Sequence, residues 1–156
     1  DRFMFELRIT YPSRTEEEAV ALQTSGESLQ EIQPVVTANH LVELQQLVRR
    51  VPVAPSVAAY AVHLARATRP GAEEAPSVVR NYVSWGAGPR ASQYLLLGAK
   101  AKAALRGEPV PNLEDVRAVA HAVLAHRVLP NFEAEADGVT ARQIVDDLLE
   151  ESRSWT

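Results

Sequence analysis

The sequence predicts an all-α fold, a helical bundle of about six helices, with one β-strand at its N-terminal end. Apolar residues recur at helical spacing in several segments of the chain. Most of those segments begin at residues that cap or start helices. Only residues 1–10 alternate apolar and charged side chains, as a strand with one buried face does.

The composition by itself excludes several classes of protein. The 156 residues amount to one domain, and 46% hydrophobic with 23% charged residues is typical of a globular chain. The net charge of -4 gives no basic field for a nucleic acid, and no apolar run approaches the roughly 18 residues of a membrane span. Because the chain has no Cys and only four scattered His, we expect no disulfide and no metal site.

The N-terminal segment is expected to be a strand whose sheet lies elsewhere. It has neither an initiator Met nor a signal-peptide pattern, and Tyr11-Pro12 stops the strand. A strand this regular needs a sheet, yet no other long strand follows it in the sequence. We therefore expect a piece of a larger protein whose sheet precedes residue 1.

The first half of the chain is expected to hold three helices. A capping box opens the first over residues 13–24, and a loop with a proline follows over 26–36. The second helix is expected over 38–48 and the third over 55–68, where a proline occupies the first position. Residues 69–84 are polar and broken by prolines and a glycine, and Tyr82 and Trp85 are expected to pack against the body.

Three further helices are expected in the second half. They run over residues 89–106, 112–124 and 140–152, begun by a proline, an Asn cap and a second capping box. Gly107 suits the position just after a helix. Residues 126–130 are expected to be extended or irregular, and the acidic residues 131–138 to be exposed. Apolar positions at helical spacing form the expected core: Leu41, Leu44, Val48, Val57, Ala61, Leu64, Ala91, Leu95, Ala99, Ala103, Val116, Val119, Val123, Leu124, Ile144, Leu148 and Leu149.

The stretch from Gly86 to Ser92 carries the strongest chemical signal. Its glycines allow positive φ angles and a close backbone approach, and Pro89 suits the first helical position. Arg90 then lies in the first turn, where a cation opposes the helix dipole. Backbone donors, the positive helix end and a guanidinium together describe a phosphate site. An exposed arginine in a solvated first turn is the alternative that local chemistry leaves open.

Read in order, short motifs along the chain resemble the C-terminal part of a MoxR-type AAA+ ATPase. The motifs are Asp1-Arg2-Phe3, Tyr11-Pro12-Ser13, Leu44-Gln45 through Arg49, Ala67-Thr68-Arg69, Gly86 through Ser92, Leu113-Glu114-Asp115-Val116, and Val123-Leu124-Ala125-His126-Arg127. The resemblance implies that residues 13–156 are the α-helical lid domain. Residues 1–12 would be the last strand of the ATPase core and the hinge.

The resemblance also implies roles for individual residues. Arg90 matches the sensor 2 arginine that approaches the γ-phosphate of ATP, with Pro89 beside it. Arg2 resembles the arginine finger that reaches the ATP of a neighbouring subunit, although an ordinary salt bridge at a strand start is the plain alternative. Tyr11 and Pro12 would line the adenine site, unless they only pack at the hinge.

Two departures from the family pattern bear on activity. The usual Gly-Ala-Ser-Pro-Arg turn has Gly88 in place of the serine, which removes a hydroxyl cap. The 156 residues also contain no Gly-Lys-Ser/Thr phosphate loop and no acidic strand end for Mg²⁺. ATP and Mg²⁺ would therefore be held by a core domain outside this sequence, and the chain alone is expected to be inactive.

For the parent protein, the resemblance implies ATP hydrolysis in a cytoplasmic homo-oligomeric ring, expected to be a hexamer. Such a ring would remodel or mature protein complexes, with partners that carry von Willebrand factor A domains. A stand-alone helical protein-interaction module without an ATPase role is the alternative, because the nucleotide loop is missing. The sequence upstream of Asp1 distinguishes the two.

Overall fold

The predicted helical fold class is confirmed by the computed structural model, which describes residues 2–25 and 32–155. Part of the predicted loop, residues 26–31, lies outside the described residues. The described chain forms eight α-helices, one short sheet and a final 3₁₀ turn. In order these are α1 Arg14–Thr24, α2 Ala38–Arg50, α3 Pro55–Ala67, α4 Ser77–Tyr82, β1 Val83–Trp85, α5 Pro89–Leu105, α6 Leu113–Leu124, β2 Leu129–Pro130, α7 Phe132–Asp137, α8 Ala141–Glu151 and η1 Ser152–Trp155.

The predicted starts of the helices are confirmed by their caps. Ser13 with Glu16 and Thr140 with Gln143 form the two expected capping boxes, and Asn112 accepts a hydrogen bond from the Asp115 amide. These side chains satisfy amide groups that have no partner inside the helix. The boundaries are therefore fixed by local chemistry that the sequence displays.

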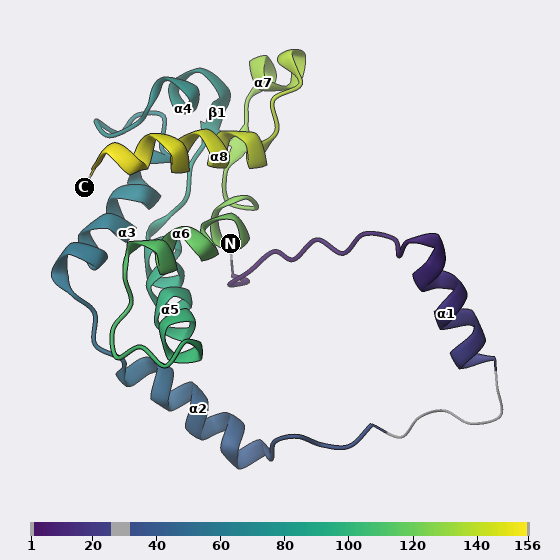
Figure 1. The fold of residues 1–156 in the computed structure, drawn as a ribbon. Helices are drawn as coiled ribbons and strands as arrows, with labels where there is room; N and C mark the ends of the chain where they lie inside the picture. The colour runs from purple at the N-terminus through teal and green to yellow at the C-terminus, as the bar shows by residue number, and fades with distance from the viewer. Residues whose placement is uncertain (1, 26–31, 156) are drawn as a thin grey trace.

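Helix α5 lies at the centre of the body and packs against α2, α3 and α6 (Figure 1). Its expected inner face is confirmed, since Ala91, Leu95, Ala99 and Ala103 are fully buried. Small residues on this face let neighbouring helices approach closely, and Gly98 touches Val119 of α6 in the same way. These contacts hold the central helix in place, and Arg90 lies in its first turn.

Two short helices and the sheet were not expected from the sequence. Helices α4 and α7 each have six residues, which is too short for a clear helical period. The strands β1 and β2 pair antiparallel, with Val83 opposite Pro130 and Trp85 opposite Leu129. This pairing joins segments that lie far apart in the sequence, so no local sequence pattern predicts it.

The strand expected over residues 1–10 forms no β-ladder within the described part of the chain. Residues 5–12 run without regular secondary structure and are drawn as an extended trace in Figure 1. The amide of Glu6 donates instead to the carbonyl of Ala122 at the end of α6, with an N···O distance of 2.8 Å. A strand requires a partner strand, and the described residues offer this segment none.

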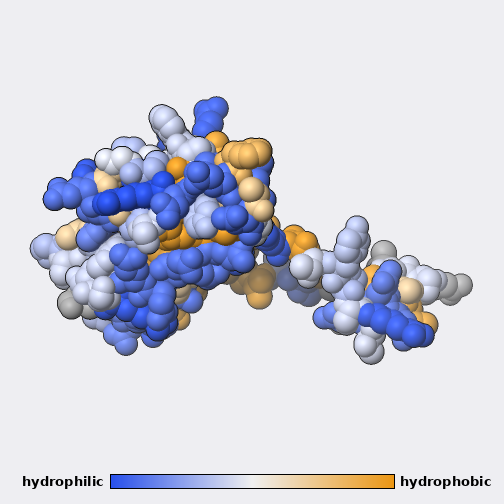
Figure 2. All heavy atoms as spheres, turned by 90° about the horizontal axis from the view of Figure 1, so that it is seen from above, coloured by the Kyte–Doolittle hydropathy of each residue, from blue (hydrophilic) through white to orange (hydrophobic). Residues whose placement is uncertain are grey.

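The first two helices are also less buried than their sequences suggest. Figure 1 places α1 apart from the body, and in Figure 2 it forms a small separate lobe. Neither α1 nor α2 has a buried residue, and Leu41 and Leu44 on the amphipathic face of α2 stay 50% and 49% exposed. The predicted amphipathic helix is confirmed, but its apolar face stays about half exposed. Among the described helices, none is long and apolar enough to cross a lipid bilayer.

Candidate functional site

Arg90 lies in the first turn of α5, as the sequence predicts, and its side chain is exposed. Gly88 is the N-cap residue and Pro89 the first helical residue, so no side chain caps this helix. The loss of a hydroxyl cap, predicted from Gly88, is confirmed. Backbone N–H groups at this end and the helix dipole thus favour an anion close to the guanidinium.

The turn before α5 is fixed by Thr68 and Arg69 at the end of α3. The buried Thr68 hydroxyl donates to the Ala65 carbonyl at 2.7 Å and accepts from the Ala87 amide at 2.8 Å. The Arg69 Nε donates to the Ala87 carbonyl at 2.9 Å. Both backbone groups of Ala87 are therefore satisfied by neighbouring side chains. The motif Ala67-Thr68-Arg69 and the motif from Gly86 to Ser92, which are separate in the sequence, are thus joined by hydrogen bonds in the fold.

Gly86 is required by a close approach of two backbones. A Cβ atom on Gly86 would collide with the Thr68 carbonyl and come within 2.7 Å of the Arg69 Cα atom. Positive φ angles do not explain this turn, because only Gly107 and Gly138 have them among the described glycines. The expectation of a left-handed turn is wrong here, and the expectation of a close approach is confirmed.

A cavity of about 420 Å³ lies beside this turn. It is lined by Arg69, Pro70, Gly71, Ser84, Trp85 and residues 86–89. Trp85 is 73% exposed, so the prediction that it packs against the body is wrong. Val83, two positions earlier in β1, is buried, and the ladder is irregular between these two residues, so the alternation that would place both on one face is broken.

The backbone of Arg2 lies next to α5. The Tyr94 hydroxyl donates to the Arg2 carbonyl at 3.1 Å, and Tyr94 lies one helical turn after Arg90. The Arg2 side chain is exposed. Two predicted site residues, Arg2 and Arg90, are thus brought to the same end of α5 although 88 positions separate them in the sequence.

His126 and Arg127, for which the sequence offered no chemical role, hold the same N-terminal segment. The Arg127 guanidinium donates to the carbonyls of Phe3 and Met4, the latter at 3.3 Å, and lies 5.2 Å from the centre of the Tyr94 ring. The His126 Nε2 is 3.3 Å from the Phe3 carbonyl. In the sequence, these two residues stood out only as part of a motif that resembles the family. The fold shows that they hold the N-terminal segment.

Positive charge accumulates around this end of α5. Burial lowers the pKa of Arg127, and the neighbouring charge of Arg90 lowers it further. Burial likewise lowers the pKa of His126, with the charge of Arg127 as the next cause.

The other two predicted nucleotide-binding residues are not brought to this place. Tyr11 and Pro12 precede α1 directly, and the Tyr11 side chain is 99% exposed. The segment that leads into α1 runs away from the body in Figure 1, and no hydrogen bond between described residues joins Tyr11 or Pro12 to the turn before α5. Within the described residues, no group of three His, Asp or Glu side chains could hold a metal ion.

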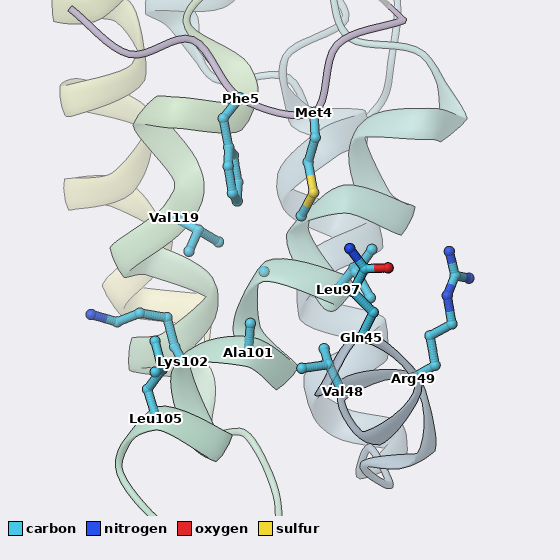
Figure 3. Close-up of a pocket in the computed structure, with 11 residues that line it drawn as sticks. Met4, Phe5, Gln45, Val48, Arg49, Leu97, Ala101, Lys102, Leu105 and Val119 are labelled. Carbon is cyan, nitrogen blue, oxygen red and sulfur yellow. The ribbon is translucent and has the colours of Figure 1, made fainter. Parts of the chain in front are cut away.

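An apolar cavity of about 550 Å³ lies behind the N-terminal segment. Met4 and Phe5 point into it from that segment, Gln45, Val48 and Arg49 border it from α2, and Val119 reaches it from α6 (Figure 3). Residues of α5, among them Leu97 and Ala101, form the rest of its wall. The N-terminal segment is thus held by apolar as well as polar contacts.

Comparison with known proteins agrees with this geometry. Residues 75–148 match the AAA lid domain family. Over 150 residues the chain is 31% identical to the uncharacterized protein YeaC of Bacillus subtilis and 29% identical to the chaperone MoxR1 of Mycobacterium tuberculosis. A crystal structure of a candidate ATPase from Cytophaga hutchinsonii superimposes with a TM-score of 0.87 and 32% identity over 96% of the chain.

The helical fold agrees with the match of residues 75–148 to an AAA lid domain. The resemblance of the chain to the C-terminal part of a MoxR-type AAA+ ATPase is confirmed. The chain spans less than half the length of these relatives, 44% of YeaC, 40% of MoxR1 and 46% of the crystallised protein.

Proposed function

We propose that this chain is the lid of a MoxR-type AAA+ ATPase in which Arg90 acts as the sensor 2 arginine. The observation that carries the proposal is the exposed Arg90 guanidinium in an uncapped first turn, behind a turn that Thr68 and Arg69 fix. A cation at this position can stabilise charge that develops on phosphoryl oxygens. The domain boundary that we propose lies between residues 12 and 13.

The residues of this chain fit the phosphate part of ATP but not its metal. Arg90, Pro89 and the uncapped helix end would hold a phosphate. Mg²⁺ would be held by a preceding core domain. When bound, ATP supplies the phosphoanhydride bond whose hydrolysis releases free energy. Because Arg90 belongs to the lid, its contact with phosphate would couple the nucleotide state to the lid position.

Arg2 is proposed as the arginine finger, acting on the nucleotide of a neighbouring subunit. An exposed side chain on a backbone that Tyr94 anchors supports this role. Tyr11 and Pro12 are proposed to line the adenine site at the hinge. In this chain they lie away from Arg90, so their role depends on how the core domain meets the exposed segment.

For the whole protein we propose a cytoplasmic homo-oligomeric ring, a hexamer, that uses ATP to remodel or mature protein complexes. The similarity to the chaperone MoxR1 supports this class of activity. Proteins with von Willebrand factor A domains are the proposed partners. The chain by itself is expected to show no ATP turnover, since it contains no phosphate-binding loop.

ATP turnover by the full-length protein tests the proposal. Arg90→Ala is expected to lower kcat by about 10²-fold or more, because a group that stabilises developing charge is removed. Arg142→Ala is the matched control, since Arg142 is also exposed near the start of a helix but lies on α8. Circular dichroism checks the fold of each variant.

Unchanged turnover in a folded Arg90→Ala variant would contradict the sensor 2 role. A full-length wild type that neither binds nor hydrolyses ATP would overturn the ATPase assignment and favour a helical interaction module.

A further inference from the structure

We propose that Arg127 is a positioning residue for Arg2, so that the lid itself sets the place of the arginine finger. The inference rests on the role proposed above for Arg2. It starts from the hydrogen bonds that the Arg127 guanidinium donates to the carbonyls of Phe3 and Met4, the two residues that follow Arg2.

The geometry of the Arg127 guanidinium suits these hydrogen bonds. Its planar fork presents several N–H donors, so it reaches two successive carbonyls and also the Val123 carbonyl at the end of α6. Arg127 is only 7% exposed, and a buried cation is stable only when its donors are satisfied. A Lys side chain has the same charge but cannot span the three acceptors in one plane. The arrangement therefore depends on an arginine.

Tyr94 joins this contact to α5. Its ring lies 5.2 Å from the Arg127 guanidinium carbon, and its hydroxyl donates to the Arg2 carbonyl at 3.1 Å. Tyr94 stands on the same helix as Arg90, one turn further along. Helix α5 therefore positions both arginines that are proposed to meet phosphate: it carries Arg90, and its Tyr94 holds the backbone of Arg2. The two arginines would serve nucleotides of different subunits.

The segment behind Arg2 is fixed on its other side as well. Met4 and Phe5 point into the apolar cavity, and the Glu6 amide donates to the Ala122 carbonyl (Figure 3). From residue 7 to residue 25 every described residue is exposed. The anchored stretch therefore ends at Glu6, and a movement of α5 and α6 would carry the backbone of residues 2–6 with it.

A positional role of this kind has a distinct kinetic signature. An arginine finger acts in the transition state, and a misplacement of about 1 Å can cost about 10²-fold in rate. Loss of the Arg127 contact is therefore expected to lower kcat and leave the KM for ATP unchanged. The effect should vanish when Arg2 has already been removed.

The experiment uses the full-length protein with Arg127→Gln, Arg127→Lys and Tyr94→Phe, each alone and combined with Arg2→Ala. Tyr94→Phe keeps the ring under the guanidinium, so it removes one hydrogen bond without a packing defect. Arg142→Gln on α8 is the control. ATP turnover, thermal stability and hydrogen exchange of the amides of residues 3–6 are measured for every variant.

We expect Arg127→Gln to lower kcat about tenfold or more, Arg127→Lys to restore it only in part, and the amides of residues 3–6 to exchange faster. Added to Arg2→Ala, Arg127→Gln should cause no further loss. If the two losses multiply, or if exchange at residues 3–6 is unchanged, the positioning role is wrong. If Arg2→Ala alone leaves turnover intact, the arginine-finger role fails, and the exchange data still decide whether Arg127 holds the segment.

Discussion

Gly86 and Gly88 stand two positions apart in one turn and meet different physical requirements. Gly86 lies against the backbone of Thr68, where a Cβ atom has no room. Gly88 is the N-cap of α5, and a Cβ atom there would meet nothing within 4 Å. The first glycine is thus required by packing, whereas the second leaves room for a side chain that could cap the helix.

Gly88→Ser is therefore expected to stabilise the domain by about 0.5 kcal/mol. Its hydroxyl can accept a hydrogen bond from an amide in the first turn of α5, and the unfolded chain loses some of its freedom. Urea unfolding of the isolated chain measures the change as a shift of the midpoint at constant slope. A lower midpoint would show that the turn cannot accept a side chain at this position.

Glu74 gives a pH-dependent prediction. The hydrogen bond from Arg66 lowers the pKa of Glu74 to about 2, and the guanidinium Nε lies 2.6 Å from the carboxylate. A carboxyl with a lowered pKa in the folded state contributes stability above its normal pKa of 4.5, and that stability is lost as the pH falls toward 2. We expect a small effect, because exposed ion pairs contribute little.

Comparison of wild type with Glu74→Gln isolates this contribution. The difference in unfolding free energy should shrink between pH 4.5 and about 2 and stay constant between pH 6 and 8. Arg66 remains charged throughout, so the trend belongs to the carboxyl. A difference that grows as the pH falls would contradict the assignment.

At the scale of elements, the junction of α3, β1 and α5 is the part that places Arg90. The end of α3 supplies Thr68 and Arg69, and the turn from Gly86 to Gly88 passes directly over them. None of these contacts involves the Arg90 side chain. Its position should therefore be sensitive to changes that leave the residue itself intact.

Gly86→Ala tests this dependence against Gly88→Ala as the matched control. The methyl group at position 86 has to displace the turn from Thr68, at a cost of about 1–3 kcal/mol, and should lower ATP turnover of the full-length protein. The same methyl group at position 88 meets open space and should leave turnover close to wild type. Equal turnover losses in both variants would show that contact with Thr68 does not set the place of Arg90.

At the scale of the whole molecule, one side of the chain is left without partners. Helix α1 has no buried residue, and apolar side chains such as Leu7, Ile9 and Leu22 are 77%, 94% and 78% exposed. The crystallised relative matches 96% of this chain with a TM-score of 0.87, and more than half of its own length lies outside the match. We expect the core domain of the full-length protein to cover this side.

Limited trypsin digestion tests the expectation. In the isolated chain the bonds after Arg8 and Arg14 should be cut rapidly, because both residues are exposed, Arg8 in irregular backbone and Arg14 at the first position of α1. In the full-length protein the same bonds should be protected. Cleavage after Arg142, at the start of α8, serves as the internal reference. Equal rates at Arg8 and Arg14 in both proteins would contradict coverage by the core.

The sequence by itself determined the helical class, the helix starts and the inner face of α5. Capping boxes and the buried face of α5 are local features. A capping box spans four residues, and the buried residues of α5 recur every four positions. The exposed position of Arg90 at the start of a helix followed from Pro89 for the same reason. Local chemistry was sufficient wherever a contact is made within one element.

Only the tertiary structure decided which of these residues meet. Thr68 and Ala87, or Arg127 and Phe3, are separated by long stretches of sequence, and their hydrogen bonds show no period or spacing. The strand expected at the N-terminus failed for the same physical reason, since a strand exists only with a partner and none is present among the described residues. The role of His126 and Arg127 as holders of the N-terminal segment likewise appears only in the folded chain, because three separate elements must come together to form it.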